Sequence, residues 1–393
     1  MPRNPALKIV MTLMVRDEAD ILAAMLEHHK AQGVDHVLVT DNGSIDETPA
    51  ILRGFVDDGF ATVWDDPVHR KQQYTTVTKM ARYAASHLGA DWVINADADE
   101  FWVTTDPSQT VRDVLAEVVD ATPYLTVPVV NLTGAPAKDG SGLTRLRFRD
   151  TRADDELHRS GIPFHPTADA VHRAHAAVEV SQGNHFVTAP GWGDGATSSD
   201  LEVLHLPWRS WRQYEHKVRA AGEAYVANPD LTPSPRHHGM QDFRRWQGGR
   251  LEAAYVAKHP TPEEVVELLA SGSLTEDGRL TVLESPMLTG HRPDIVYTAA
   301  ESQELAEIGR LMAQLEATAD ARYLEVRDQL TEAHRVSDRA IGERNSAVAD
   351  RDRLAAERDH LAALLRSEKD RLVVRVADKI GAVARRVLRR SRS

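Results

Sequence analysis

Two acidic residues one position apart, Asp97 and Asp99, carry the clearest chemistry in the sequence. They follow an apolar run from Trp92 to Ala96 that has the pattern of a buried strand. Residues two apart in an extended chain point the same way, so both carboxylates are expected to project together from the strand end. Such a pair repels unless a cation or shared proton intervenes. Mg2+ or Mn2+ meets that need, since these hard cations take oxygen ligands and bridge to phosphates.

A pair of this kind also occurs in solvated turns, so the surrounding elements matter. The first hundred residues alternate strand and helix patterns, with strands expected over 7–14, 36–40, 60–64 and 91–96 and helices over 18–32, 45–57 and 71–87. Ser44 and Glu47 have capping-box spacing for the second helix. This order predicts the α/β class, with a mostly parallel, Rossmann-like sheet covered by helices.

Polar side chains follow three of the expected strands where each one ends. Arg16 and Asp17 follow the first strand, Asp41 and Asn42 the second, and the Asp97–Asp99 pair the fourth. Ligands of parallel α/β sheets bind at the carboxyl ends of the strands. Three such loops converging on one edge favour a binding site over an ordinary solvated turn.

The amino-acid composition changes at about residue 299, after which Gly and Pro are rare. Every seventh residue from 305 to 361 is apolar, which gives nine in succession: Leu305, Met312, Ala319, Val326, Ala333, Ala340, Ala347, Leu354 and Leu361. This repeat predicts a coiled coil over 299–366 and, most simply, a homo-oligomer. The alternative is a single solvated helix that packs back on the body.

The end of the chain, 367–393, has the profile of a basic amphipathic helix. From Lys369 to Ser393 it carries nine Lys or Arg residues against two acids, and Leu372, Val376 and Ile380 share one helical stripe. This pattern predicts peripheral contact with an anionic membrane surface. The alternative is a plain basic tail.

Composition excludes several classes of protein. The formal net charge of the 393 residues is -12, which argues against general nucleic-acid binding. The chain has no cysteine, so disulfides, thiolate catalysis and zinc–cysteine sites are excluded. The sequence shows no signal-peptide pattern and no apolar run long enough for a transmembrane helix. The expected location is the cytoplasm, with peripheral contact at the inner face of the cell membrane.

Several motifs together resemble a family 2-type glycosyltransferase with a GT-A fold, in the bacterial branch that carries a D-x-D-E-F motif. The resemblance covers roughly residues 7–255. It rests on Val15-Arg16-Asp17-Glu18, Asp41-Asn42-Gly43-Ser44, Asp97-Ala98-Asp99-Glu100-Phe101, Gln182-Gly183-Asn184-His185 and Leu204-His205-Leu206-Pro207-Trp208-Arg209.

The resemblance implies a metal-dependent, inverting transfer of a sugar from a nucleotide-sugar donor to a hydroxyl of a cell-surface or secreted glycan. It implies that Asp97 and Asp99 hold Mn2+ or Mg2+, which neutralises the departing diphosphate. A downstream histidine would complete the metal site, with His205 as the first choice and His185 as the second. The donor-binding residues would be Val15, Arg16, Glu18, Asp41, Asn42, Asp97, Arg209 and Lys217.

An inverting transfer needs a general base on the acceptor hydroxyl. Asp194, in a glycine-rich loop, and Glu100 are the residues we assign to catalysis, with Asp242 as a rival. The sequence contains no clear copy of the acidic pair that many members of the resembled family use there.

The resulting domain plan is a GT-A domain over 1–230, a helical extension over 231–298, the coiled coil and the basic tail. The expected partners are a nucleotide-sugar donor, a glycan or lipid-linked acceptor, and further copies of the chain. Two other functions remain open. One is a sugar nucleotidyltransferase, against which the absence of a Gly-rich loop after the first strand counts. The other is a nucleotide-sugar-binding coiled-coil scaffold without catalysis.

Overall fold

The computed structural model describes residues 7–67, 73–159, 162, 165–226, 238–285, 288–342 and 348–390. A seven-stranded sheet in the order β13-β6-β10-β4-β1-β2-β3 forms the body of its N-terminal part. The strands are β13 (Ala196–Thr197), β6 (Tyr124–Val127), β10 (Asp169–Arg173), β4 (Trp92–Ala96), β1 (Ile9–Val15), β2 (His36–Asp41) and β3 (Ala61–Asp65). Strands β4, β1, β2 and β3 pair in parallel, whereas β10 is antiparallel to both of its neighbours. The predicted mixed α/β class is confirmed.

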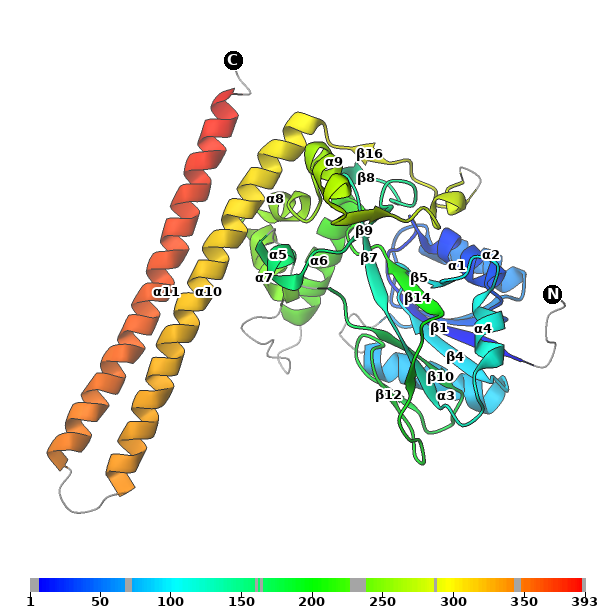
Figure 1. The fold of residues 1–393 in the computed structure, drawn as a ribbon, viewed down its shortest axis with the longest axis horizontal. Helices are drawn as coiled ribbons and strands as arrows, with labels where there is room; N and C mark the ends of the chain where they lie inside the picture. The colour runs from blue at the N-terminus through cyan, green and yellow to red at the C-terminus, as the bar shows by residue number, and fades with distance from the viewer. Residues whose placement is uncertain are drawn as a thin grey trace.

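Helices cover both faces of this sheet, as Figure 1 shows. On one face α1 (Leu22–Ala31) and α2 (Thr48–Asp57) pack on alternate residues of β1, including Met11 and Leu13. On the other face α3 (Gln73–His87) packs on the intervening residue Val10. This alternation is the two-residue period of a strand that is buried on both sides.

Two of the predicted helices, over 18–32 and 45–57, begin later in the structure, at Leu22 and Thr48. Helix α2 begins at Thr48 with Glu47 as its N-cap, so the predicted capping box at Ser44 is wrong. Ser44 instead donates from its backbone N and its Oγ to Asp41 Oδ1, at 2.9 and 2.6 Å. Residues 71 and 72 of the predicted third helix lie outside the described residues.

A second sheet has the strand order β15-β9-β7-β14-β5. Its strands are β15 (Leu274–Glu276), β9 (Phe148–Asp150), β7 (Val129–Thr133), β14 (Leu201–His205) and β5 (Glu100–Thr104). In β14, His205 pairs with Glu100 on one side and with Asn131 on the other. This register places His205 beside the turn that follows β4.

Smaller elements connect the two sheets. They are α4 (Val111–Glu117), β8 (Ala137–Asp139), α5 (Asp154–Arg159), β11 (Glu179–Val180), β12 (Val187–Thr188), β16 (Ile295–Val296) and a 3-10 helix at Thr281–Leu283. A helical layer follows them, composed of α6 (Trp211–Val226), α7 (His238–Gln247), α8 (Leu251–Val256) and α9 (Pro262–Ser271). Helix α6 matters most for function, because it returns from the second sheet to the strand ends of the first.

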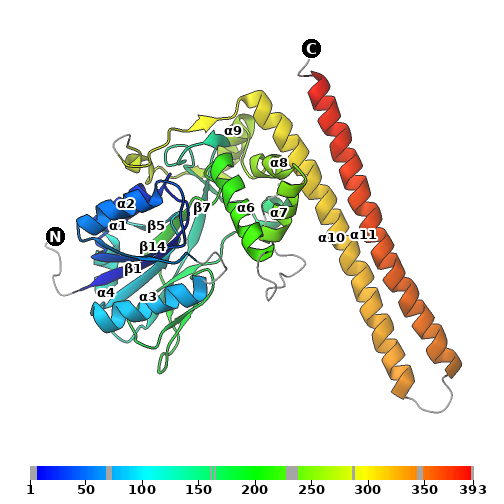
Figure 2. The ribbon, with the colours of Figure 1, turned by 180° about the vertical axis from the view of Figure 1, so that it is seen from behind.

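Two long helices, α10 (Ala299–Gly342) and α11 (Val348–Arg390), lie side by side in Figures 1 and 2. Met312 of α10 is buried against Ala253 and Ala254 of α8, and Ile380 of α11 joins the same cluster. The predicted heptad repeat spans the end of α10 at Gly342 and the start of α11 at Val348, and Ala347 of that repeat lies outside the described residues. Association with another copy stays a prediction.

The boundary expected at 366, between a coiled coil and a basic tail, has no counterpart in the helix structure. Helix α11 runs through it without a break. None of the helices in the described segments combines the length and apolar character needed to span a bilayer.

Candidate active site

The ends of β1, β2 and β4 open onto a cavity of about 240 Å3, which we call the strand-end cavity. Helix α6 forms its other wall, and Gln73 at the start of α3 lies at its edge. The lining residues are Met14, Val15, Arg16, Asp17, Glu18, Asn42, Gln73, Asp97, Ala98, Asp99, Gln213, His216, Lys217, Ala220 and Ala221. The cavity therefore lies where the α/β sheet predicted a ligand.

Asp99 is almost fully buried and is surrounded by cationic groups. Its Oδ2 accepts from Lys217 Nζ at 2.9 Å and from Arg209 Nη1 at 3.4 Å. Burial acts to raise the pKa of Asp99, but Lys217, together with His205 in its protonated form, outweighs it and holds the pKa well below its usual range. Asp99 is therefore a carboxylate at neutral pH.

His205 faces the other oxygen of the same carboxylate. Its Nε2 lies 3.7 Å from Asp99 Oδ1, and its Nδ1 lies 2.8 Å from Asn131 Oδ1. The amide oxygen is an acceptor, so Nδ1 must carry the proton and donate to it. In the neutral ring, Nε2 then presents a lone pair toward Asp99.

Asp97 is held by two amides. Its Oδ1 accepts from Gln73 Nε2 at 2.7 Å and from Asn184 Nδ2 at 3.3 Å. Burial and the neighbouring Asp99 carboxylate raise the pKa of Asp97 to about 6. The predicted juxtaposition of the two carboxylates at the end of β4 is present, and their environments push their pKa values apart.

Arg209 lies beneath the cavity and has no exposed surface. Its guanidinium pairs with Asp20, at 2.8 Å from Nε to Oδ2, and also with Glu18 and Asp99. Burial raises the pKa of Glu18 to about 7, although Arg209 opposes that shift. The planar fork of arginine suits several carboxylates at once, so Arg209 joins the loop after β1 to the turn after β4.

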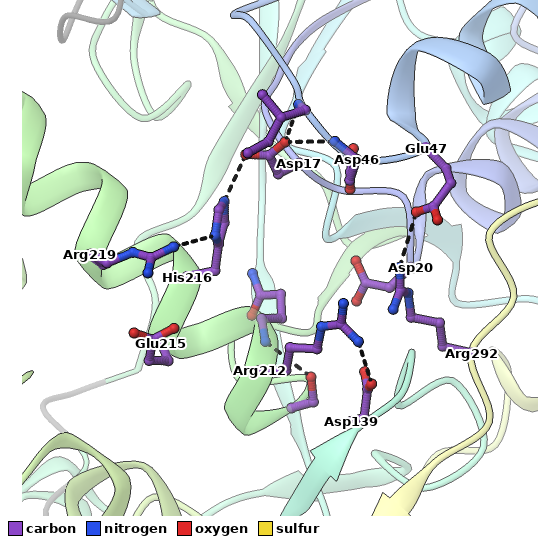
Figure 3. Close-up of a pocket in the computed structure, with 13 residues that line it drawn as sticks. Asp17, Asp20, Asp46, Glu47, Asp139, Arg212, Glu215, His216, Arg219 and Arg292 are labelled. Carbon is purple, nitrogen blue, oxygen red and sulfur yellow. Dashed lines mark hydrogen bonds and ion pairs between the residues drawn. The ribbon is translucent and has the colours of Figure 1, made fainter.

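A second cavity, of about 450 Å3, adjoins the first, and Figure 3 shows its lining. We call it the adjoining cavity. Asp17, Gln213 and His216 line both cavities. The remaining lining residues are Asp20, Ile45, Asp46, Glu47, Asp139, Ser210, Arg212, Glu215, Arg219 and Arg292.

Asp17 and His216 form a bonded pair between the two cavities. His216 Nε2 lies 2.7 Å from Asp17 Oδ2, as Figure 3 shows. The hydrogen bond to Asp17 raises the pKa of His216, and despite partial burial the same bond lowers the pKa of Asp17. The pair is thus an imidazole oriented by a carboxylate.

Most of the predicted donor-binding residues line the strand-end cavity, namely Val15, Arg16, Glu18, Asn42, Asp97 and Lys217. Asp41 and Arg209 do not. Asp41 is buried and accepts from Ser44, and Arg209 is buried among carboxylates. Neither residue lines the cavity, and the direct donor contact expected of them stays a prediction.

The predicted catalytic residues lie away from both cavities. Glu100 is buried, its Oε2 accepts from the backbone N of Asp97 at 2.9 Å, and burial raises its pKa well above the usual range. Asp194 is exposed in the loop before β13, at the edge of the sheet. Asp242, the rival, bonds Tyr214 and Arg245 in the helical layer. None of the three lines either cavity, and the assignment of the base stays a prediction.

The second choice for the metal histidine, His185, bonds Asp169 at 2.8 Å and does not line either cavity. Within the described part of the chain, no three His, Asp or Glu side chains are arranged as a ligand set for a metal ion. Of the predicted metal residues, Asp99 and His205 face each other and Asp97 lies beside them, and metal binding stays a prediction.

Sequence reasoning missed His216, Gln73 and Gln213 as cavity residues. His216 directly precedes Lys217 on α6, and this position was the one signal that pointed to it. Gln73 and Gln213 carry no motif. Their roles follow from where α3 and α6 begin relative to the strand ends.

Residues 10–150 match the family model of Glycosyltransferase family 92, over about a third of the chain. The predicted enzyme class, a glycosyltransferase, is confirmed at the level of this match. The matching model is that of family 92, so the finer family 2-type assignment stays a prediction. No curated protein matches the chain closely enough to count as a relative.

Among solved structures, the chain is similar to S. aureus TarS 1-349. The identity is 12%, with 67% of this chain and 83% of that chain covered and a TM-score of 0.32. It is also similar to glucosyl-3-phosphoglycerate synthase from Mycobacterium tuberculosis in complex with Mn2+, UDP and glucosyl-3-phosphoglycerate. There the identity is 16%, with 43% and 57% covered and a TM-score of 0.24. Likeness at this level carries no conclusion about the reaction.

Proposed function

We propose that this chain is a metal-dependent glycosyltransferase of the family 2 type, which moves a sugar from a nucleotide-sugar donor to a hydroxyl of a cell-surface or secreted glycan. The observation that carries the proposal is the pair of Asp99 and His205, which face each other at 3.7 Å beside the strand-end cavity. The family 92 match over residues 10–150, which contains Asp99, supports it.

The facing pair fits a divalent cation. A carboxylate oxygen and an imidazole lone pair gain nothing from facing each other unless a proton or cation lies between them. Two ligands about 2.1 Å from one cation are roughly 3.0 to 3.6 Å apart at common coordination angles, which is near the observed separation. Mg2+ is commonly held by one or two carboxylates, waters and substrate phosphates, so two protein ligands suffice. A bound Mn2+ or Mg2+ would neutralise charge on a departing diphosphate.

The surroundings support placing the donor in the strand-end cavity. Lys217 Nζ is partly exposed and lies on Asp99, so a diphosphate beside Asp99 would meet an ammonium as well as the cation. Arg16 and Asn42 line the far side, where the nucleoside would lie. The acceptor hydroxyl would enter through the adjoining cavity, whose polar lining suits a hydroxylated molecule. An inverting outcome follows from the family 2-type resemblance.

The test is donor binding by isothermal titration across UDP-, GDP- and dTDP-glucose, with Mn2+, with Mg2+ and with EDTA. Wild type, Asp99→Asn and His205→Ala are compared, and the matched control is His87→Gln, at the exposed last residue of α3, the end of the helix opposite Gln73. We expect one nucleotide class to bind with metal, and binding to fall at least tenfold in both site variants. Metal-independent binding that both variants retain would reject the metal site.

A further part of the proposal concerns membrane contact by α11. Of the predicted apolar stripe, Val376 is buried and Ile380 packs on the α8 cluster. Val373 and Val374 are exposed instead, as are the basic residues Lys369, Arg371, Arg375 and Lys379. Basic and apolar groups on one exposed helix segment suit an anionic bilayer surface. Replacing the four basic residues by glutamine should abolish co-sedimentation with phosphatidylglycerol vesicles. Equal sedimentation of the variant, or equal binding to phosphatidylcholine vesicles, would reject an electrostatic contact.

The proposed homo-oligomer rests on the heptad repeat of α10 and α11. Light scattering of the full chain and of a chain ending at residue 298 would compare their masses. A monomeric full chain would reject the association, and the enzyme proposal would be unaffected.

A further inference from the structure

His216 occupies the boundary between the two cavities. It projects from α6 and lines both the strand-end cavity and the adjoining cavity, and about 30% of its side chain is exposed. Under the proposed function, the donor and the acceptor hydroxyl meet at this boundary. A side chain placed there can contact the reacting atoms from either cavity.

The bonds around Asp17 decide which nitrogen of His216 is protonated. Asp17 Oδ1 accepts from the backbone N atoms of Ile45 and Asp46, at 2.7 and 3.3 Å. Asp17 Oδ2 lies 2.7 Å from His216 Nε2, which must donate to it, and 3.8 Å from Arg16 Nε. The lone pair of the neutral ring lies on Nδ1, which accepts from Arg219 Nη2 at 3.4 Å, a long bond that an acceptor hydroxyl would replace.

Asp17 is held in place at a conformational cost. Its φ is +55°, in the left-handed region that non-glycine residues rarely adopt. Its backbone N donates to Ser44 Oγ at 3.0 Å, and Ser44 Oγ donates to the buried Asp41. Strained backbone of this kind persists where the surroundings impose it, and it gathers at functional sites. Here it aims the Asp17 carboxylate at His216.

The other carboxylates that line the adjoining cavity are already engaged. Asp20 pairs with Arg209, Glu47 with Arg292 and Asp139 with Arg212. Asp46 accepts from the backbone N atoms of Ala19 and Thr48, and Glu215 accepts from Trp246. Each of these carboxylates already has a partner, whereas an imidazole takes up a proton near neutral pH.

We propose that His216 is the general base of the transfer and that Asp17 positions it, an inference that rests on the proposed function. Nδ1 of His216 takes the proton of the acceptor hydroxyl. The oxygen forms its bond to the anomeric carbon as the bond from that carbon to the diphosphate breaks, and the nucleoside diphosphate leaves with the electron pair. Asp17 keeps Nε2 protonated and balances the imidazolium that forms.

Burial and three charged groups set the titration of His216. Asp17 and Glu215 favour its protonated form, burial and Arg219 oppose it, and the pKa of His216 is raised on balance, mainly by the hydrogen bond to Asp17. A base must be neutral to act, so the rate should fall on the acidic side of this pKa. Water in place of the acceptor needs the same base, and donor hydrolysis therefore reports the step without a known acceptor.

The test measures hydrolysis of whichever of UDP-, GDP- or dTDP-glucose the wild type binds, together with its Kd, over pH 5 to 9. The variants are His216→Gln and Asp17→Asn, with His87→Gln as the matched histidine control. In His216→Gln we expect kcat to fall about 10²- to 10⁴-fold with Kd unchanged. The residual rate should no longer fall at acidic pH. In Asp17→Asn the acidic fall should move to lower pH. Thermal unfolding checks that each variant is folded.

The outcomes separate the two proposals. An unchanged kcat in His216→Gln overturns the base assignment and leaves the glycosyltransferase proposal intact. A weaker Kd with unchanged kcat also overturns it, because His216 would then be a cationic contact for the diphosphate. If Asp17→Asn leaves the acidic fall of the pH–rate profile at the same pH, Asp17 does not position His216. If the wild type neither binds nor hydrolyses any donor, the proposed function fails and the inference fails with it.

Discussion

His205 Nε2 lies 3.7 Å from Asp99 Oδ1, while Nδ1 of the same ring bonds Asn131. The register of the second sheet produces this relationship. Strand β14 lies between β5 and β7, so His205 has Glu100 on one side and Asn131 on the other. The strand that carries the histidine is thereby tied to the turn that carries the carboxylate, and a neighbouring strand supplies the group that orients the ring.

Asn131 should therefore influence metal affinity without being a ligand. In Asn131→Leu the ring of His205 loses its acceptor, and partners of this kind are worth about 10- to 100-fold in affinity. Mn2+ titration followed by electron paramagnetic resonance measures the change. Asn131→Asp keeps an acceptor and should retain the affinity. Equal affinity in all three proteins would show that the orientation of His205 does not matter.

Arg209 should be a stability determinant. Arg209→Met leaves the buried carboxylates of Glu18, Asp20 and Asp99 without their shared cation, a loss of about 3–5 kcal/mol in the free energy of unfolding for a buried pair. Arg212→Met, which breaks the exposed pair with Asp139, should cost at most about 1 kcal/mol. Urea unfolding of the two variants makes the comparison. Similar losses in the two variants would mean that Arg209 is not a stability determinant.

Glu18 should make stability depend on pH. Its pKa rises to about 7 in the folded state, mainly through burial, from an ordinary value of 4.5. The protonated form is thus favoured in the native state, and this contribution is present below pH 4.5 and lost as pH rises through about 7. Relative to Glu18→Gln, the wild type should become less stable between pH 5 and pH 8.

Thermal unfolding at several pH values measures this difference. Glu47→Gln, at a largely exposed carboxylate, is the control and should follow the wild type. A constant difference between wild type and Glu18→Gln across this range would show that Glu18 titrates normally.

The contact between α10 and α8 depends on a glycine. A Cβ at Gly309 would lie 2.1 Å from the backbone O of Ala253, so Gly309→Ala should destabilise this packing by about 1–3 kcal/mol. Gly54 of α2 has open space around it, and Gly54→Ala should stabilise by about 0.5–1 kcal/mol through helix propensity. Unfolding measurements on both variants should show opposite signs. The same sign in both would mean that α10 does not pack on α8 in this way.

Several features of this protein could be read from the sequence. Strand and helix periods in the first hundred residues are local patterns, and they predicted the order of elements in the parallel sheet. The order in turn implied that Arg16, Asn42 and the Asp97–Asp99 pair share one edge, because parallel strands end together. All of these residues line the strand-end cavity.

Other features depend on contacts between distant segments. Ser44 has the spacing of a helix cap but supports Asp17, because the loop after β2 packs on the loop after β1. Arg209 was expected to contact the donor, but it is buried and paired with three carboxylates. The heptad repeat from residue 305 to 361 is compatible with one long helix or with two that lie side by side, because the repeat does not show whether the chain reverses its direction.

Periodicity and chain order were enough to predict the parallel strands β1 to β4, the loops at their ends and the carboxylates in those loops. Which side chains act together depends on tertiary contacts. Asp17 and His216 are 199 positions apart and bond at 2.7 Å, because α6 returns across the strand ends after the chain has built the second sheet. Neither residue carries a local signal for the other, since their partnership depends on where two distant backbones meet.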